Sequence, residues 1–245
     1  MAGIVSNRKL HANERSFYEE NGYVVVPDLF PIEELREVDV ELDRLVEEAR
    51  IKGTSGIGRL GGNRNEGWLM QLGLRSEITQ RFVQDERLLD LVQDIVKPGV
   101  AIYSAKLTAK MPRSTAICHW HQDNAYYNAH ALSKTRMSTW IPLIDVNEEN
   151  GCLWVVPGSH KAGVSEHGQF GGQCPQSIGP SDMVAEGAIP CPVKAGSILL
   201  FSSNLWHHSK GNKTDQVRRA FIVSYQEATV LGGNADQWKV LRNSN

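Results

Sequence analysis

The spacing of hydrophobic residues differs between the first hundred residues and the remainder of the chain. In the first part, apolar residues recur three or four positions apart, as they do on the buried face of a helix. This pattern is clearest after Pro31, and it continues to Leu45. Shorter helices are predicted over residues 14–20, with Asn13 as the N-cap, and over residues 88–95.

From Val100 onward, short runs rich in Val, Ile, Thr, Tyr and Trp alternate with turn residues. Such runs are typical of β-strands, and several in succession indicate a sandwich or a barrel. The predicted strands are residues 101–109, 116–123, 137–146, 152–156, 198–201 and 217–226. We therefore expect a single domain over residues 1–245, with a mainly helical flank (1–99) and a β core (100–228).

Two long polar segments interrupt this pattern. Residues 53–65 are rich in glycine but lack the phosphate-loop motif, so we expect a flexible surface segment there. The segment from Ser159 to Pro190 is also polar and rich in glycine. A loop of this length inside a domain is usually a lid, a binding loop or a disordered segment.

Composition excludes several classes of function. The chain of 245 residues is 41% hydrophobic, 22% charged and carries a net charge of -2, as is normal for a globular protein. It has no run of Lys and Arg, so we expect no nucleic-acid partner. It also has no apolar run near the ~18 residues that span a membrane and no visible secretory signal. We expect a cytoplasmic protein without a membrane partner.

The cysteines give no sign of a structural framework. Cys118, Cys152, Cys174 and Cys191 show no CxxC spacing and are few for a chain of this length. We expect free thiols in a reducing compartment.

Candidate metal ligands lie in the β part of the chain. His121 and Asp123 are two positions apart on a predicted strand, so both should point to the same face. His207 comes from a distant segment. Two His and one carboxylate leave three positions of an octahedron open, which is the ligand set of non-haem Fe(II) oxygenases. His119 shares the same predicted face and is an alternative ligand, whereas His208 should face away and play a structural role.

A candidate anchor for an anion follows the late histidine. Arg218 lies on the last predicted strand, and its planar guanidinium suits a carboxylate. Ser209 shares the face of His207 and can donate a hydrogen bond to the same anion. Arg219 should face away from Arg218, towards solvent. A His-x-Asp motif alone is common by chance, but its combination with a late His and an Arg is far more specific.

These stretches resemble the phytanoyl-CoA hydroxylase (phytanoyl-CoA dioxygenase) family of 2-oxoglutarate oxygenases. The resemblance rests on HQD at residues 121–123, Trp140, NGCLWVVPGSHK at 150–161, AGSILLF at 195–201 and LWHHSKGNKTDQVRRA at 205–220. The joint match is specific, and it covers the C-terminal half of the chain. The N-terminal half is similar only in its general helical character.

The resemblance implies a mainly β fold with flanking helices, the double-stranded β-helix (a cupin-like jelly roll). It implies Fe(II) held by His121, Asp123 and His207, and 2-oxoglutarate as cosubstrate, with Arg218 anchoring the distal carboxylate. Further residues that the resemblance places in the cosubstrate pocket are Gln122, Trp140, Ser209 and, with looser spacing, Tyr103.

The implied activity is hydroxylation of a small-molecule metabolite with O2, releasing succinate and CO2. A related branch halogenates carbon and has a small residue in place of the carboxylate, so the presence of Asp123 favours hydroxylation. No basic cluster near the motifs would hold a CoA phosphate tail, which favours a smaller substrate. Tyr126 and Tyr127 either line the substrate entrance or pack in the core.

Two other functions are compatible with such a fold. One is a cupin-like metal hydrolase or isomerase that uses no keto acid and therefore has no need of Arg218. The other is a non-enzymatic ligand-binding jelly roll, which has no need of intact metal ligands.

Overall fold

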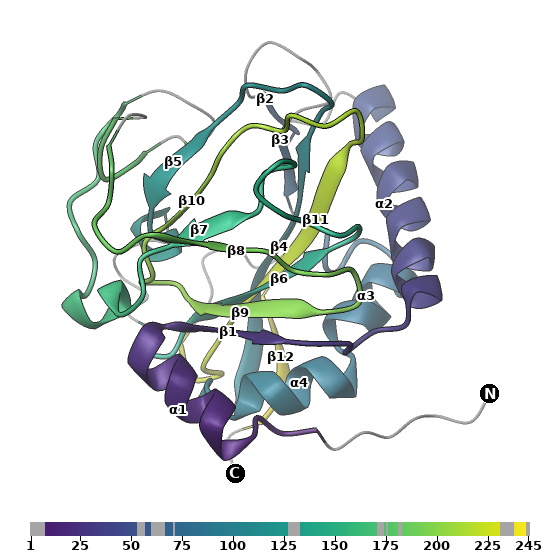
Figure 1. The fold of residues 1–245 in the computed structure, drawn as a ribbon. Coiled ribbons are helices and arrows are strands. Elements are labelled where there is room, and N and C mark those ends of the chain that lie inside the picture. Colours follow the sequence, from purple (N-terminus) through teal and green to yellow (C-terminus); the bar gives the residue numbers. More distant parts are fainter. Residues whose placement is uncertain are drawn as a thin grey trace.

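The computed structural model contains two β-sheets, with helices against one of them (Figure 1). It describes residues 8–52, 57–59, 67–70, 72–126, 133–170, 174, 176–180, 183–230 and 238–243. Within the Gly-rich segment 53–65, residues 57–59 form a strand. The rest of that predicted flexible segment lies outside the described residues.

The larger sheet contains the long strands of the β core and is antiparallel throughout. Its strands are β1 (Tyr23–Val26), β2 (Ile57–Arg59), β3 (Gly67–Met70), β4 (Val100–Lys110), β6 (Met137–Pro142), β9 (Ile198–Ser202), β11 (Arg218–Gln226) and β12 (Lys239–Arg242). They lie in the order β1-β9-β6-β11-β4-β3-β2, and β12 pairs with β4.

The smaller sheet faces the first and consists of four short strands in the described part of the chain. These strands are β5 (Cys118–His121), β7 (Leu153–Val155), β8 (Ile189–Cys191) and β10 (His207–Ser209), in the order β5-β10-β7-β8. From β4 to β11 the chain passes back and forth between the two sheets. This winding is the double-stranded β-helix, so the predicted fold class is confirmed.

Four helices accompany the sheets in the described residues: α1 (Ala12–Asn21), α2 (Ile32–Lys52), α3 (Glu77–Val83) and α4 (Glu86–Gln93). The predicted helices correspond to α1, α2 and α4, although α1 begins after His11 rather than at the predicted cap Asn13. The sequence interpretation missed α3 as well as β1, β2, β3, β8 and β12. None of the described helices has the length and apolar character that crossing a membrane requires.

Strand alternation separates two apolar cores on the two faces of the larger sheet. On β11, Phe221 and Val223 point outward and belong to the same cluster as Leu35 of α2 and Phe82 of α3. Ile222 points the other way, into the space between the sheets. Helices therefore fill the outer face, and the inner face is left to line the interior of the jelly roll.

The cysteines correct one expectation. Cys118 and Cys174 form a disulfide with their Cα atoms 5.1 Å apart, whereas Cys152 and Cys191 are buried free thiols. The prediction of free thiols is therefore wrong for the first pair. Their separation of 56 residues in sequence gives no sign of contact, which the folding of the long loop onto β5 creates.

Replacement of Tyr225 by Phe should destabilise the fold through one hydrogen bond. The fully buried Tyr225 hydroxyl donates to the Val83 carbonyl over 2.8 Å and ties β11 to the end of α3. The change leaves that carbonyl without this donor, so we expect a loss of about 1–3 kcal/mol in the free energy of unfolding. Urea unfolding measures it, with the exposed Val40→Ala as a control that should change stability by less than about 0.5 kcal/mol. A loss equal to that of the control would contradict the expectation.

Candidate active site

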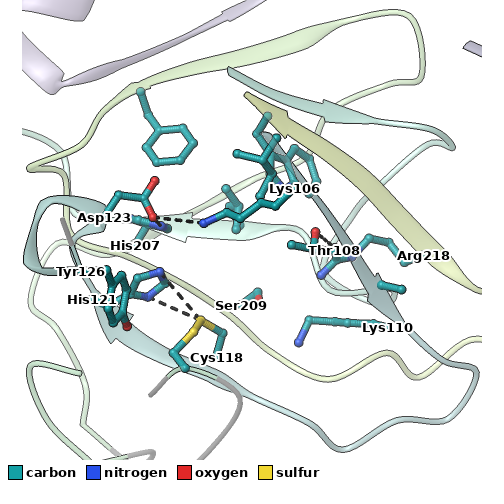
Figure 2. Close-up of a pocket in the computed structure, with 16 residues that line it drawn as sticks. Lys106, Thr108, Lys110, Cys118, His121, Asp123, Tyr126, His207, Ser209 and Arg218 are labelled. Atoms are coloured by element: carbon teal, nitrogen blue, oxygen red, sulfur yellow. Dashed lines mark hydrogen bonds and ion pairs between the residues drawn. A yellow bond between two sulfur atoms is a disulfide. The ribbon is translucent and has the colours of Figure 1, made fainter. Parts of the chain in front are cut away.

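Three buried side chains from separate segments meet between the two sheets (Figure 2). They are His121 at the end of β5, Asp123 just beyond it and His207 at the start of β10. One nitrogen or oxygen atom from each lies within 4.8 Å of the others. His121 and His207 face each other as a cross-strand pair, with ring centroids 4.1 Å apart. The predicted grouping of these residues is thus present in the structure.

Hydrogen bonds to backbone carbonyls fix the orientation of the two imidazoles and which ring nitrogen carries the proton. Nδ1 of His121 lies 2.8 Å from the His119 carbonyl, and Nδ1 of His207 lies 2.9 Å from the Leu205 carbonyl. A carbonyl oxygen accepts but does not donate, so Nδ1 carries the proton in both rings. Each ring then offers the lone pair of Nε2, which is the arrangement that metal-binding histidines use.

The route by which these residues converge differs from the one predicted. Asp123 does not continue the strand but begins a 3-10 helix, Asp123–Tyr126. Within β5 the register against β10 shifts, since His121 pairs with His207 while Cys118 pairs with Ser209. Two residues therefore oppose the single His208, as in a β-bulge.

The bulge decides which residues reach the cavity. Cys118 and His121 line the cavity, whereas His119 does not. The structure therefore does not support His119 as the alternative metal ligand. His208 lies on the opposite side, as expected, and stacks on Trp120 with ring centroids 4.2 Å apart.

Both carboxylate oxygens of Asp123 have a polar partner. Ser138 of β6 donates a hydrogen bond of 2.8 Å to Oδ2, and Ser224 of β11 lies 2.9 Å from the Ser138 hydroxyl. The Lys106 ammonium lies 3.6 Å from Oδ1. Burial opposes ionisation of Asp123, but Lys106, the two imidazoles and Ser138 together hold the pKa of this carboxyl below its usual range.

The histidines have the opposite charge preference. Burial lowers the pKa of His121 and of His207, and the attraction of Asp123 offsets only part of this effect. Near neutral pH the three groups are therefore two neutral imidazoles and one carboxylate. These are the protonation states that a divalent metal requires of its ligands.

Arg218 lies in the same cavity, on the side away from the histidines (Figure 2). Arg218 is almost fully buried, with 3% of its surface exposed. Burial lowers the pKa of its guanidinium to about 10, so the group remains cationic near neutral pH. Nη1 donates to the Thr108 hydroxyl over 3.3 Å, and the buried Nε has no hydrogen-bond partner among the described residues. A buried guanidinium with so few acceptors suits an anionic guest.

The other predicted pocket residues divide into two groups. Ser209 and Trp140 line the cavity, and the Arg218 guanidinium lies 5.7 Å from the Trp140 ring. Gln122 does not line it, because its side-chain amide donates to the carbonyls of Gly163 and Asn204. The prediction that Gln122 lies in the cosubstrate pocket is therefore wrong. His121 and Asp123 on either side of it point into the cavity, and Gln122 points away from it.

Tyr103 is also not among the cavity residues. Its ring lies under the guanidinium of Arg136, 4.4 Å from ring centroid to cation. The residues of β4 that do line the cavity are Lys106, Thr108, Ala109 and Lys110, further along the strand. The sequence interpretation missed these residues, although strand alternation in the predicted strand 101–109 carried the signal for Lys106 and Thr108.

Arg219 faces outward, as predicted, but it is not simply solvated. Its guanidinium lies 3.0 Å from Asp39 and 2.8 Å from Asp43, both on α2. The two neighbouring arginines therefore differ in role: Arg218 lines the cavity inside the jelly roll, and Arg219 forms ion pairs that hold α2 against its outer face.

The long loop between residues 159 and 190 packs across the smaller sheet where it is described. Gln122 donates its backbone N–H to His167 and accepts from the backbone N–H of Ser165. Tyr126 lines the cavity and donates its hydroxyl to the Gln176 carbonyl, and burial raises the pKa of this phenol. Tyr127 lies outside the described residues.

The residues present fit a metal ion and a diacid. Two neutral imidazoles and a carboxylate converge on one point, and a buried guanidinium with an unpaired Nε faces the same cavity. Phe201, Leu153 and Ile222 add apolar surface to the lining of the cavity. The arrangement can hold a divalent cation and an anionic chelator.

A family model and several curated proteins match the sequence of this chain. A model of the phytanoyl-CoA dioxygenase (PhyH) family matches residues 18–220. Ectoine dioxygenase of Bordetella parapertussis is 27% identical over 235 residues, covering 88% of this chain and 75% of the relative. Phytanoyl-CoA dioxygenase domain-containing protein 1 of Bos taurus is 32% identical over 123 residues, 48% of this chain and 42% of the relative.

Solved structures share the fold at lower identity. The non-haem α-ketoglutarate-dependent carbocyclase SnoK from nogalamycin biosynthesis has a TM-score of 0.74 and 21% identity, covering 96% of this chain and 92% of its own. EctD from S. alaskensis, solved with 2-oxoglutarate and 5-hydroxyectoine, has a TM-score of 0.73 and 20% identity, covering 94% and 80%. Because the family model spans most of the chain, this protein belongs to the phytanoyl-CoA dioxygenase family of Fe(II)- and 2-oxoglutarate-dependent oxygenases.

Proposed function

We propose that the protein hydroxylates a small-molecule metabolite with Fe(II), 2-oxoglutarate and O2, within a single domain formed by residues 1–245. In this proposal His121, Asp123 and His207 hold the iron, and Arg218 with Ser209 holds the distal carboxylate of 2-oxoglutarate. The observation that carries it is the buried Arg218 guanidinium in the cavity of the triad, with its Nε lacking a partner in the described residues.

When bound, iron and 2-oxoglutarate supply the oxidising power for insertion of oxygen into a C–H bond, with release of succinate and CO2. The residues of this chain position and desolvate the reactants. Ser138 engages Oδ2 of Asp123, and Oδ1, which lies 3.9 Å from Nε2 of His207, would be the ligand atom. Arg218 and the Trp140 ring confine a diacid on the far side of the cavity, and Phe201 packs 4.8 Å from the His207 ring and limits access of water.

The buried charge of Arg218 favours an enzyme that uses a keto acid over a metal hydrolase or isomerase. A cupin-like hydrolase needs the three metal ligands but has no use for a cation buried opposite them. Retaining Arg218 without an acceptor for Nε would cost stability and give such an enzyme nothing. A non-enzymatic binding module is disfavoured in turn by the ordered, correctly protonated ligand set.

The reaction type needs its own test, because similar folds carry other reactions, including that of the carbocyclase SnoK. The protein loaded with Fe(II) should be incubated with 2-oxoglutarate, O2 and a metabolite library. Hydroxylation adds one oxygen atom to the product, ring closure removes two hydrogen atoms and epimerisation leaves the mass unchanged. Succinate formed with a product that gains one oxygen supports the proposal, and substrate-stimulated succinate with unchanged mass would contradict hydroxylation.

Replacement of Arg218 by Ala should raise the KM for 2-oxoglutarate by roughly 100-fold or more, the scale of a lost charge-assisted contact of ~3 kcal/mol. Steady-state succinate formation measures it. Arg219→Ala is the matched control, since that neighbouring guanidinium pairs with Asp39 and Asp43 on the outer face. The control should keep the wild-type KM, and an equal KM in both variants would show that Arg218 does not anchor 2-oxoglutarate.

Replacement of Ser138 by Ala should weaken Fe(II) binding about 10- to 100-fold, because Asp123 loses the hydrogen bond that orients it. Competition with a chromophoric chelator under nitrogen measures the affinity without any turnover. Thr139→Val is the control: this neighbour is equally buried but donates to the Val223 carbonyl rather than to a ligand. Unchanged Fe(II) affinity in Ser138→Ala would show that Asp123 does not depend on this contact.

A further inference from the structure

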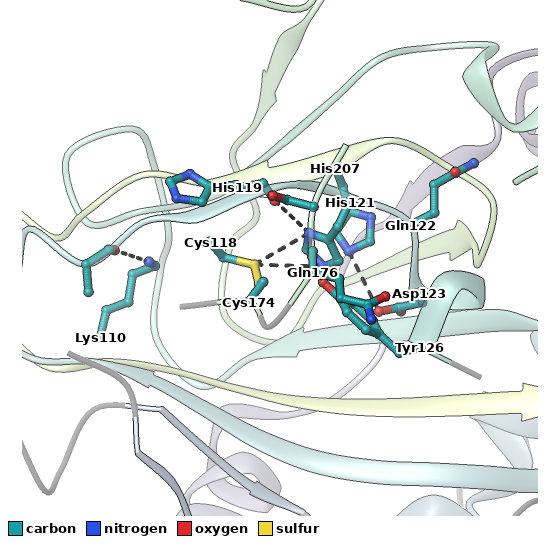
Figure 3. The surroundings of a disulfide bond; sticks show 12 residues. Lys110, Cys118, His119, His121, Gln122, Asp123, Tyr126, Cys174, Gln176 and His207 are labelled. Carbon is teal, nitrogen blue, oxygen red and sulfur yellow. Dashed lines mark hydrogen bonds and ion pairs between the residues drawn. A yellow bond between two sulfur atoms is a disulfide. The ribbon is translucent and has the colours of Figure 1, made fainter. Parts of the chain in front are cut away.

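The disulfide lies directly beside the candidate iron site (Figure 3). Cys118 begins β5, and its Sγ lies 3.5 Å from Nδ1 and 3.8 Å from Nε2 of His121. Cys174 belongs to the long loop between residues 159 and 190. Both cysteines line the same cavity as the triad, so small ions that reach the triad also reach the two sulfur atoms.

Contacts other than the disulfide hold this part of the loop against β5. Ile178 donates its backbone N–H to the Trp120 carbonyl over 2.7 Å, and the Trp120 indole donates to the Met183 carbonyl over 3.2 Å. The Gln176 carbonyl accepts the hydroxyl of Tyr126. Because these bonds flank Cys174 on its C-terminal side, reduction of the disulfide should leave the two thiols near each other rather than release the loop.

Reduction changes the donor set beside His121. A small dithiol reductant attacks one sulfur, the S–S bond breaks, and the reductant leaves as its own disulfide after giving two electrons and two protons. The products are the thiols of Cys118 and Cys174; in the disulfide-bonded structure the ligand atoms of these two residues and of His121 lie within 4.8 Å of one another. Two sulfurs and one imidazole nitrogen, with a position left for water, match the tetrahedral preference of Zn(II) and Cd(II).

We propose that Cys118, Cys174 and His121 form a second metal site, which takes soft or borderline divalent cations and exists only when the disulfide is reduced. Binding of the cation displaces the thiol protons to solvent. Nδ1 of His121 is committed to the His119 carbonyl, so Nε2 is the nitrogen available to either site. One lone pair cannot serve two cations, and the two sites are therefore mutually exclusive.

The disulfide then has a definite role. In the oxidised chain the sulfurs are bonded to each other and cannot bind a cation, so His121 stays available to its partners Asp123 and His207. In the reduced chain a thiophilic cation competes for His121. This consequence for iron rests on the proposed function, whereas the thiolate site itself does not.

Titration of the metal-free protein with Cd(II) tests the site, because thiolate-to-cadmium charge transfer absorbs in the ultraviolet. The chain is prepared in two states, with the disulfide intact and with it reduced and the reductant removed under nitrogen. We expect the reduced chain to develop the band with one equivalent of Cd(II), and the oxidised chain to develop none. Absence of the band in the reduced chain would overturn the proposal.

Variants assign the band to particular residues. Cys174→Ser should abolish the one-equivalent band, and His121→Ala should weaken Cd(II) binding at least about tenfold, as expected on loss of one ligand. The double variant Cys152→Ser/Cys191→Ser is the control for the other buried thiols and should keep the band. A band that survives Cys174→Ser, or disappears in the double variant, would place the cation elsewhere and refute the proposal.

Asp123→Ala separates this site from the iron site. Its reduced form should keep the cadmium–thiolate band although one iron ligand is gone, and loss of the band would show that binding of Cd(II) to the sulfur atoms requires Asp123, which would overturn a separate site. In reduced wild-type protein one equivalent of Cd(II) should displace Fe(II) at least tenfold more effectively than in Cys174→Ser. If the protein binds Fe(II) but forms no succinate, the proposed function is wrong. The cadmium band tests the thiolate site independently of that result.

Discussion

The burial of a guanidinium opposite a carboxylate, at two ends of one cavity, is the constraint on which the site depends. Arg218 and Asp123 are each almost fully buried, and neither is paired with the other. Asp123 has Ser138 and Lys106 as partners, whereas among the described residues the Arg218 guanidinium donates to the Thr108 hydroxyl and its Nε has no hydrogen-bond partner. Charges buried in this way cost stability unless a guest of the opposite sign completes them. The register of β4 and β11 fixes where that guest must lie.

The predictions from sequence succeeded where strands are regular. Alternation along β11 correctly separated Arg218 from Arg219, and the motifs in the C-terminal half indicated the jelly roll. They failed where local geometry departs from the pattern. The bulge in β5 brings Cys118 rather than His119 into the cavity, and the 3-10 turn carries Asp123. Neither the bulge nor the contact between Cys118 and Cys174 has a signature in residue spacing, because both depend on how the long loop and the neighbouring strand pack.

The same shared imidazole connects the two chemistries that we propose. His121 lies between the hard ligands Asp123 and His207 on one side and the sulfur atoms on the other. Its ring is fixed by a backbone carbonyl, so selection between cations falls to the state of the disulfide rather than to movement of the ring. Related folds support different outcomes with one cosubstrate, and the residues around the cavity, including Lys106 and Tyr126, are where such differences would arise.

The central claim is that the triad and Arg218 together bind a metal-chelating diacid. Anaerobic titration of the Fe(II)-loaded protein with 2-oxoglutarate tests it most directly, because chelation of Fe(II) by a keto acid produces a visible metal-to-ligand charge-transfer band. We expect this band to appear and to saturate at one equivalent. A protein that binds Fe(II) but develops no band at any concentration of 2-oxoglutarate would contradict it.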